Sequence, residues 1–129
     1  MIIHVKDAGP GPTDIGIRYD LPAVASRVTQ DQAVAAATAR LGQPLAAQAS
    51  QIETRYVLFT DEQWYQQDAA GVKHYVLQRV PAWVVTFSGV NFALSGGGRD
   101  SSPTPRFNHE VNVVIDARTG EYLQLFSYR

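Results

Sequence analysis

The sequence predicts an α+β fold, in which one main helix packs on a mostly antiparallel sheet of four or five strands. One segment near residues 29–41 has helical spacing, whereas the chain from residue 51 onward alternates apolar and polar side chains with a period of two. The last two alternating runs, within residues 110–126, are joined by turn-forming residues, which predicts a C-terminal hairpin. Strands with one apolar face need a cover, and the helix supplies it.

Length and composition limit the classes of protein that this chain can represent. Its 129 residues are 45% hydrophobic, carry a net charge of -1 and include no cysteine. One domain with a real core is expected, without disulfides or thiolate chemistry. The near-zero charge argues against nucleic acid as a partner, because a phosphate-backbone binder needs a basic face. No window approaches the roughly 18 apolar residues of a membrane-spanning helix, so we expect no membrane insertion by this segment.

Residues 1–28 are predicted to be an irregular lead-in, an edge strand or a linker. Short extended pieces are expected near residues 2–5 and 14–19, separated by the Gly-Pro-Gly-Pro run at 9–12. The α+β domain is expected to occupy residues 29–129. The apolar start, residues 1–5, is shorter than the roughly 7–15-residue core of a signal peptide. The chain is therefore either cytosolic or has an export segment that lies outside this sequence.

The helix prediction rests on its two ends. Thr29 is a favourable N-cap, and Gln32 completes a capping-box pattern. Gly42 is expected to end the helix after Leu41. The expected apolar stripe is Ala33, Val34, Ala37 and Leu41. Its small side chains should let the helix lie close to the sheet.

Five alternating runs predict the strands. They are residues 52–59, 72–80, 83–88, 110–116 and 122–126. Pro81 is expected between two strands, where its missing N–H does least harm. Asp116 and Gly120 supply the turn chemistry of the final hairpin. Residues 93–106 are rich in glycine, serine and proline and are predicted to be a long loop with a mobile or functional role.

Three segments, taken in order, carry a family resemblance. They are the helix start TQDQAVAAA at 29–37, the strand PAWVVTF at 81–87 and the hairpin VNVVIDARTGE at 111–121. Together they resemble the PepSY-type domain, a small α+β module of thermolysin-type metallopeptidase propeptides and of many exported or membrane-attached bacterial proteins. The resemblance implies a non-catalytic binding or regulatory module without a cofactor, whose partner is a peptidase or another protein. It also implies an extracytoplasmic location, and fold roles for Trp83, Asp116 and Gly120.

The chemistry-bearing residues predict no catalytic or metal site. His4, His74 and His109 lie in three separate segments, whereas zinc needs three or four convergent ligands. No serine lies in a nucleophile-elbow motif. We therefore expect no catalytic residue, no metal and no enzyme activity. The alternative is a small-ligand-binding or enzymatic α+β domain, cystatin-like or cone-shaped, which requires polar groups converging inside a concave sheet. A third possibility is a structural domain of a longer chain.

Aromatic residues in polar connections are the candidate contact residues. Trp64 and Tyr65 lie in the connection at 62–70, and Phe92 and Phe107 flank the long loop at 91–108. Exposed rings often form recognition surfaces. The competing interpretation is that Trp64 folds back to cover the sheet edge. These two connections, or an added β-strand, are the expected means of recognising a peptide or protein.

Overall fold

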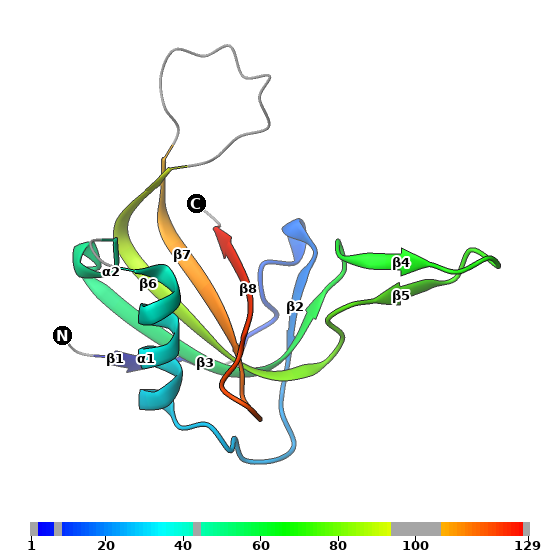
Figure 1. The fold of residues 1–129 in the computed structure, drawn as a ribbon, viewed down its shortest axis with the longest axis horizontal. Coiled ribbons are helices and arrows are strands. Elements are labelled where there is room, and N and C mark those ends of the chain that lie inside the picture. Colours follow the sequence, from blue (N-terminus) through cyan, green and yellow to red (C-terminus); the bar gives the residue numbers. More distant parts are fainter. Residues whose placement is uncertain (1–2, 7–8, 43–44, 94–106, 128–129) are drawn as a thin grey trace, which may run out of the picture.

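The computed structural model describes residues 3–6, 9–42, 45–93 and 107–127 of the chain. The predicted α+β class is confirmed: one main helix packs on a curled sheet, and a small separate hairpin projects from it (Figure 1). The elements are β1 (Ile3–Val5), η1 (Thr13–Ile15), β2 (Ile17–Asp20), α1 (Gln30–Leu41), α2 (Leu45–Gln48), β3 (Gln51–Asp61), β4 (Tyr65–Gln67), β5 (Lys73–Tyr75), β6 (Val80–Ala93), β7 (Phe107–Asp116) and β8 (Tyr122–Ser127).

The main sheet has six strands in five positions. Its order is β1-β3-β6-β7-β8, and β2 also pairs with β3. The strands β1 and β2 share the outer side of β3, since β1 pairs with its first half in parallel and β2 with its second half in antiparallel. All other pairings in this sheet are antiparallel. Parts of the lead-in at residues 1–28 therefore lie in the sheet as edge strands.

The helix α1 begins and ends where the sequence predicts. The Thr29 hydroxyl accepts from the Gln32 backbone N–H at 3.1 Å, and the Gln32 side chain accepts from the Thr29 N–H at 2.9 Å. At the other end the Gly42 N–H donates to the Thr38 carbonyl at 2.9 Å. Ala33 and Ala37 are fully buried. Their small side chains allow the close approach of α1 to β6 and β7 that the alanine stripe predicted.

The sheet buries apolar side chains on both faces. One set, which we call the helix-side core, lies under α1 and α2; the other, the inner core, lies on the opposite face. The helix-side core consists of Val28, Ala33, Ala37, Ala46, Ala49, Ile52, Val85, Phe87, Val90, Val111, Val113 and Ile115. The inner core consists of Ile17, Tyr19, Val57, Phe59, Leu77, Ala82, Val84 and Val114. Neighbouring residues of the central strands β6 and β7 thus contribute to different cores.

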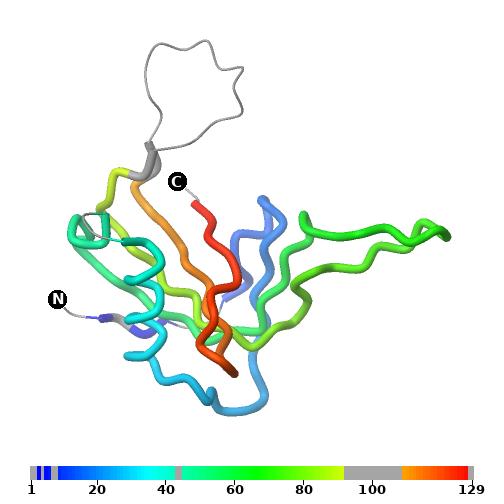
Figure 2. The backbone as a smooth tube through the Cα atoms, in the orientation of Figure 1, coloured from blue at the N-terminus to red at the C-terminus, as the bar shows by residue number. Residues whose placement is uncertain are grey.

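Contacts across the inner core show that the sheet curls toward that face. The rings of Phe59 on β3 and Phe126 on β8 lie 6.2 Å apart, and the Gln124 side-chain amide donates to the Asp61 carboxylate at 2.7 Å. Two strands lie between β3 and β8. On a flat sheet, three strand spacings would separate them by about 14 Å. The end of β3 therefore bends over toward β8, as the tube in Figure 2 shows, while α1 covers the other face.

The predicted strand at 72–80 is wrong as a single element. The structure has β5 at its start, irregular backbone at 76–79, and then β6. The side chain of Leu77 is buried in the inner core, and Arg79 has a φ of 50° while its N–H donates to the Thr60 hydroxyl at 2.9 Å. The burial of Leu77 and these bonds to the end of β3 outweigh the continuous alternation. Pro81 is also not between strands but is the second residue of β6, just before pairing with β7 begins.

The C-terminal hairpin is longer than the predicted range of 110–126. Pairing between β6 and β7 extends to Phe92 and Ala93, opposite Asn108 and Phe107, after a register shift that follows Ser88. The outer residues of the connection predicted at 91–108 are thus strand residues. The glycine-rich part, residues 94–106, lies outside the described residues.

The turn between β7 and β8 has the predicted chemistry. The Asp116 carboxylate accepts from the Arg118 N–H at 2.7 Å and from its guanidinium at 3.0 and 3.1 Å. The Gly120 N–H donates to the Asp116 carbonyl at 2.8 Å. Burial acts to raise the pKa of Asp116, but these hydrogen bonds and the charge of Arg118 outweigh it and lower the pKa below its usual 3.8.

We expect Asp116→Asn to lower the free energy of unfolding at pH 7 by about 1 kcal/mol, because an amide cannot accept both guanidinium bonds as a charged group. The wild-type advantage should be complete above the unfolded pKa and disappear as the pH falls through the lower folded pKa. Urea unfolding of both proteins at pH 7 and at about pH 2.5 measures this difference. An advantage of the same size at both pH values would contradict the assigned cause.

Candidate functional site

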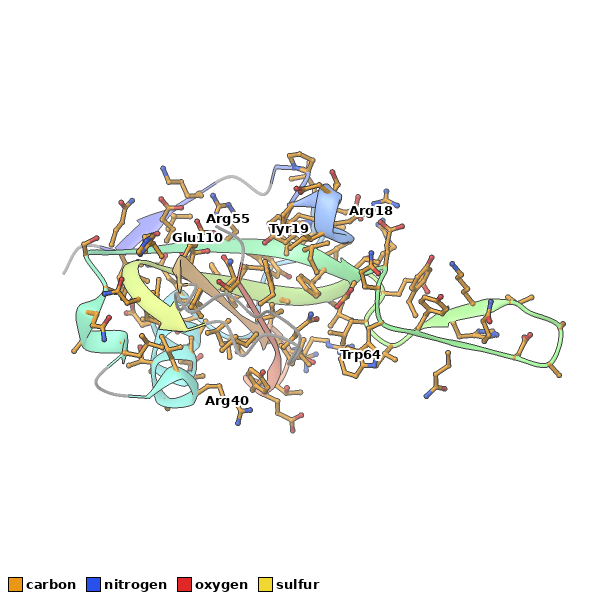
Figure 3. All side chains as sticks on the ribbon, turned by 90° about the horizontal axis from the view of Figure 1, so that it is seen from above. Arg18, Tyr19, Arg40, Arg55, Trp64 and Glu110 are labelled. Carbon is orange, nitrogen blue, oxygen red and sulfur yellow. The ribbon has the colours of Figure 1, made fainter. Side chains whose placement is uncertain are left out.

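The strands β4 and β5 form a hairpin that projects from the main sheet, and we call residues 62–76 the arm. Tyr65 pairs with Tyr75 and Gln67 with Lys73. Figure 1 shows the arm extending beyond the rest of the molecule, and Figure 3 shows its side chains standing on both sides of the ribbon. All three residues of β4 are exposed. The arm therefore adds surface to the protein while contributing little to either core.

The tip of the arm is held by one carboxylate. Asp68 accepts from the N–H groups of Ala70 and Val72 at 2.9 and 3.0 Å, and its second oxygen lies 3.0 Å from Nε2 of His74. The hydrogen bond with His74 is the main cause that lowers the pKa of Asp68, followed by the bond with Val72. Asx turns of this kind organise a tight connection. The arm is thus a defined hairpin, not an irregular connection.

Large side chains are exposed along the arm. Trp64 is 46% exposed, Tyr65 is 38% exposed, and Val72 and Val76 are also exposed. Tyr65 meets Tyr75 edge to face with ring centres 6.2 Å apart, and the Lys73 ammonium lies 4.5 Å from the Tyr65 ring centre. These contacts restrict the rings before any partner arrives. The structure thus places Trp64 and Tyr65 together on the arm.

The other two predicted contact residues lie elsewhere. Phe92 and Phe107 are on β6 and β7, near the end of that strand pair farther from the arm. Neighbouring register positions bring their backbones close, since Phe92 pairs with Asn108 and Ala93 with Phe107. The four predicted residues therefore belong to two separate regions of the molecule.

Polar side chains gather on the curled-in face of the sheet, beyond the inner core. We call Glu53, Arg55, Thr86, Glu110 and Asn112 the inner-face polar cluster. Arg55 donates to Glu53 at 3.4 Å, the Thr86 hydroxyl donates to Asn112 at 2.6 Å, and the Asn112 amide donates to Glu110 at 3.3 Å. Most of its hydrogen-bonding capacity is therefore satisfied within the cluster.

The inner-face polar cluster lies toward the buried Tyr19 of β2 (Figure 3). Burial raises the pKa of the Tyr19 hydroxyl well above its usual 10; Arg55 opposes this rise and Glu110 adds to it. Sequence reasoning missed this cluster because its members are 59 positions apart at most and carry no motif. The available signal was the alternation itself, which puts Glu53 and Arg55 on one face of β3 and Glu110 and Asn112 on one face of β7.

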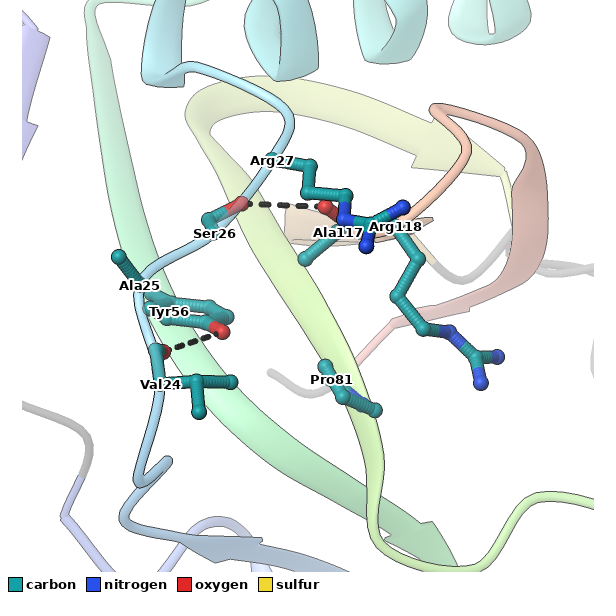
Figure 4. A pocket seen from close by; sticks show the side chains of 8 residues that line it. All are labelled: Val24, Ala25, Ser26, Arg27, Tyr56, Pro81, Ala117 and Arg118. Atoms are coloured by element: carbon teal, nitrogen blue, oxygen red, sulfur yellow. Dashed lines mark hydrogen bonds between the residues drawn. The ribbon is translucent and has the colours of Figure 1, made fainter.

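A pocket of about 330 Å³ lies at a third place, between the segment at 24–27 and the starts of β6 and the final turn (Figure 4). Its lining residues are Val24, Ala25, Ser26, Arg27, Tyr56, Pro81, Ala117 and Arg118. Sequence reasoning did not identify this pocket, because the lining residues come from four separate segments that only the tertiary structure brings together.

The histidines do not converge. His74 lies on the arm, the ring of His109 on β7 is 3.2 Å from the Val90 carbonyl, and the backbone of His4 belongs to β1. Within the part of the chain that the structure describes, no three histidine, cysteine or acidic side chains are grouped so as to hold a metal ion. In the same described ranges, no helix is both long enough and apolar enough to cross a membrane.

The chain matches no protein-family model, no curated protein and no solved structure. The arm, the inner-face polar cluster and the pocket are therefore the features from which function has to be argued.

Proposed function

We propose that this protein is a non-catalytic protein-binding module of PepSY-like type, acting outside the cytoplasm, and that the arm is its contact surface. The single observation that carries the proposal is the projection of a preorganised hairpin with two exposed rings, Trp64 and Tyr65. Rigid aromatic side chains give large contact area at low cost in conformational entropy. This is the chemistry of an interface anchor.

The separation of the arm from both cores supports the same proposal. The tip is held by its own contacts around Asp68, and none of the residues from 62 to 75 belongs to the helix-side core or the inner core. A hairpin that stabilised the fold would bury its large side chains, because burial is what stabilises. The exposed side chains of the arm are thus better explained by contact with another molecule.

A peptidase is the partner class that we favour. The sequence resemblance to propeptide modules supports it, and so does the shape of the arm, which could enter a cleft. The charges on the arm include Asp68 paired with His74, and Lys73 placed over Tyr65. Recognition would therefore depend mainly on the rings and on shape, with a weak dependence on salt.

The double substitution Trp64→Ala with Tyr65→Ala is expected to weaken binding about 30-fold or more, because truncated anchor residues cost about 2 kcal/mol or more. The probe is a thermolysin-type metallopeptidase, and the measurement is its equilibrium binding and its inhibition by the purified protein. Leu21→Ala is the matched control, since Leu21 is 79% exposed and lies outside the arm.

Two outcomes would count against the proposal. Equal affinity of the arm variant and the wild type would exclude the arm as the contact surface. Failure of the wild-type protein to bind the peptidase at micromolar concentration would exclude that partner class. Unchanged thermal unfolding of the arm variant is expected, because neither substituted side chain is buried.

The alternative of a small-ligand or enzymatic site on a concave sheet has weaker support. The curled-in face does bring polar groups together, as that alternative requires. However, Arg55 is bonded to Glu53, and Thr86 and Glu110 are both bonded to Asn112. A polar site that binds a ligand keeps donors or acceptors available for it, and these groups largely satisfy one another.

A further inference from the structure

The pocket beside the segment at 24–27 carries a second inference, which is independent of the arm. Its volume of about 330 Å³ is at the lower end of the range for small-molecule sites. Most of its lining side chains are apolar or aromatic, namely those of Val24, Ala25, Tyr56, Pro81 and Ala117. An apolar group the size of a leucine side chain would fit this space.

The wall of the pocket is held in place by hydrogen bonds and ring contacts. The Tyr56 ring stacks on Trp83 with centres 5.5 Å apart, and its hydroxyl donates to the Val24 carbonyl at 2.8 Å. The Trp83 indole N–H lies 2.9 Å from the Ser26 hydroxyl, which in turn donates to the Ala117 carbonyl at 3.2 Å. The segment at 24–27 is therefore fixed against the sheet, and the pocket is preformed, which lowers the cost of binding.

The charges around the pocket do not cancel. Figure 4 shows the guanidinium groups of Arg27 and Arg118 on the same side of the pocket, across from Val24 and Ala25. Arg118 is paired with the Asp116 carboxylate, its salt-bridge distance being 3.0 Å. Among the described residues, Arg27 has no acidic partner within salt-bridge distance. Two guanidinium groups and one carboxylate leave a net charge of +1 beside an apolar cavity.

We propose that this pocket binds a carboxylate attached to a small apolar body. Arg27 would receive the carboxylate, because a free guanidinium matches both of its oxygens, and the apolar body would lie against Tyr56 and Pro81. A peptide that ends in an apolar residue with a free C-terminus has this chemistry, and so does a short branched aliphatic acid. For a ligand this small, the dissociation constant is expected to be on the order of 1 mM.

The test is a titration followed by backbone amide chemical shifts in NMR, with N-acetyl-leucine as the probe. We expect saturable shifts at Ala25, Arg27 and Ala117, whereas N-acetyl-leucine amide, which lacks the carboxylate, should bind at least about 10-fold more weakly. N-acetyl-glycyl-leucine and 4-methylpentanoic acid distinguish the two sources. Tighter binding of the first indicates a peptide C-terminus, and tighter binding of the second indicates a free acid.

The residue-level test is Arg27→Gln, which should weaken the binding of N-acetyl-leucine about 10-fold or more. Arg27 is exposed, so this variant is expected to fold normally. Arg18→Gln is the matched control, because Arg18 is also exposed but lies on β2 and not in the pocket. The proposal would be overturned by equal binding of acid and amide, by unchanged affinity of Arg27→Gln, or by no shift at these residues at about 10 mM ligand.

Discussion

Phe87→Ala is expected to lower the free energy of unfolding by about 3–5 kcal/mol, the range for removal of a fully buried ring. Phe87 has 0% exposure in the helix-side core. It lies on the central strand β6, between its register partners Ile52 on β3 and Val111 on β7. Strands on both sides prevent the site from closing over the cavity. Urea unfolding followed by circular dichroism measures the loss, and Leu21→Ala, at an exposed position, should change it by less than about 0.5 kcal/mol.

The same loss is expected for Phe59→Ala, although this ring lies in the inner core. Phe59 has 0% exposure, and its ring centre is 6.2 Å from that of Tyr19 and 6.2 Å from that of Phe126. Its removal would also take away the contact that joins β3 to β8 across the curl. Each variant is expected to remain folded only if the wild-type stability exceeds these losses.

The two cores can be shown to be separate by combining milder changes. Phe59→Leu and Phe87→Leu should give losses that add within about 0.5 kcal/mol, because the rings lie on opposite faces of the sheet and share no core cluster. A coupling of 1 kcal/mol or more between them would contradict the division into two cores.

Gly89→Ala is the second change with a large expected effect, a loss of about 2 kcal/mol or more. Gly89 has a φ of +81°, a conformation that costs energy for any residue with a Cβ. An added Cβ would also meet the Ser50 hydroxyl, with the Ser50 Cβ at 3.0 Å and its backbone nitrogen at 3.2 Å. Ser50 cannot easily retreat, because its N–H donates to the Ser88 carbonyl at 2.9 Å. Thermal and urea unfolding measure the loss.

Gly71→Ala separates the two causes. Gly71 also has a φ of +81°, but an added Cβ there would have nothing within 4 Å. Its loss should therefore reflect backbone strain alone, about 1 kcal/mol. If Gly71→Ala and Gly89→Ala cost the same, the contact with Ser50 would be unimportant. A smaller loss for Gly89→Ala in a Ser50→Gly background would support the steric cause.

Local signals account for what could be predicted. The helix ends at Thr29 and Gly42 follow from side-chain and backbone preferences within one turn. The same holds for the Asp116 turn, whose bonds join residues at most four positions apart. Such features depend on neighbours in the chain, so they can be inferred without knowing the fold.

The candidate sites were harder to predict, and for a physical reason. Trp64 and Tyr65 could be singled out, because large rings in a polar segment are unusual. That they lie on a hairpin depends on Leu77, whose burial in the inner core turns the chain and separates β5 from β6. The pocket depends on the packing of the segment at 24–27 against Tyr56 and Trp83. These contacts join residues about 30 to 60 positions apart, for which the sequence has no local signal.

The sequence by itself determined the α+β class, the helix with its caps, and the alternation of the main strands. Tertiary structure decided which side of each strand is buried. Along β3 the buried side changes from that of Ile52 to that of Val57 and Phe59, and at the centre of β6 and β7 both sides are buried. Alternation defines two faces but does not say what covers them. That choice is made by the pairing of distant strands and the curl that closes Phe59 onto Phe126.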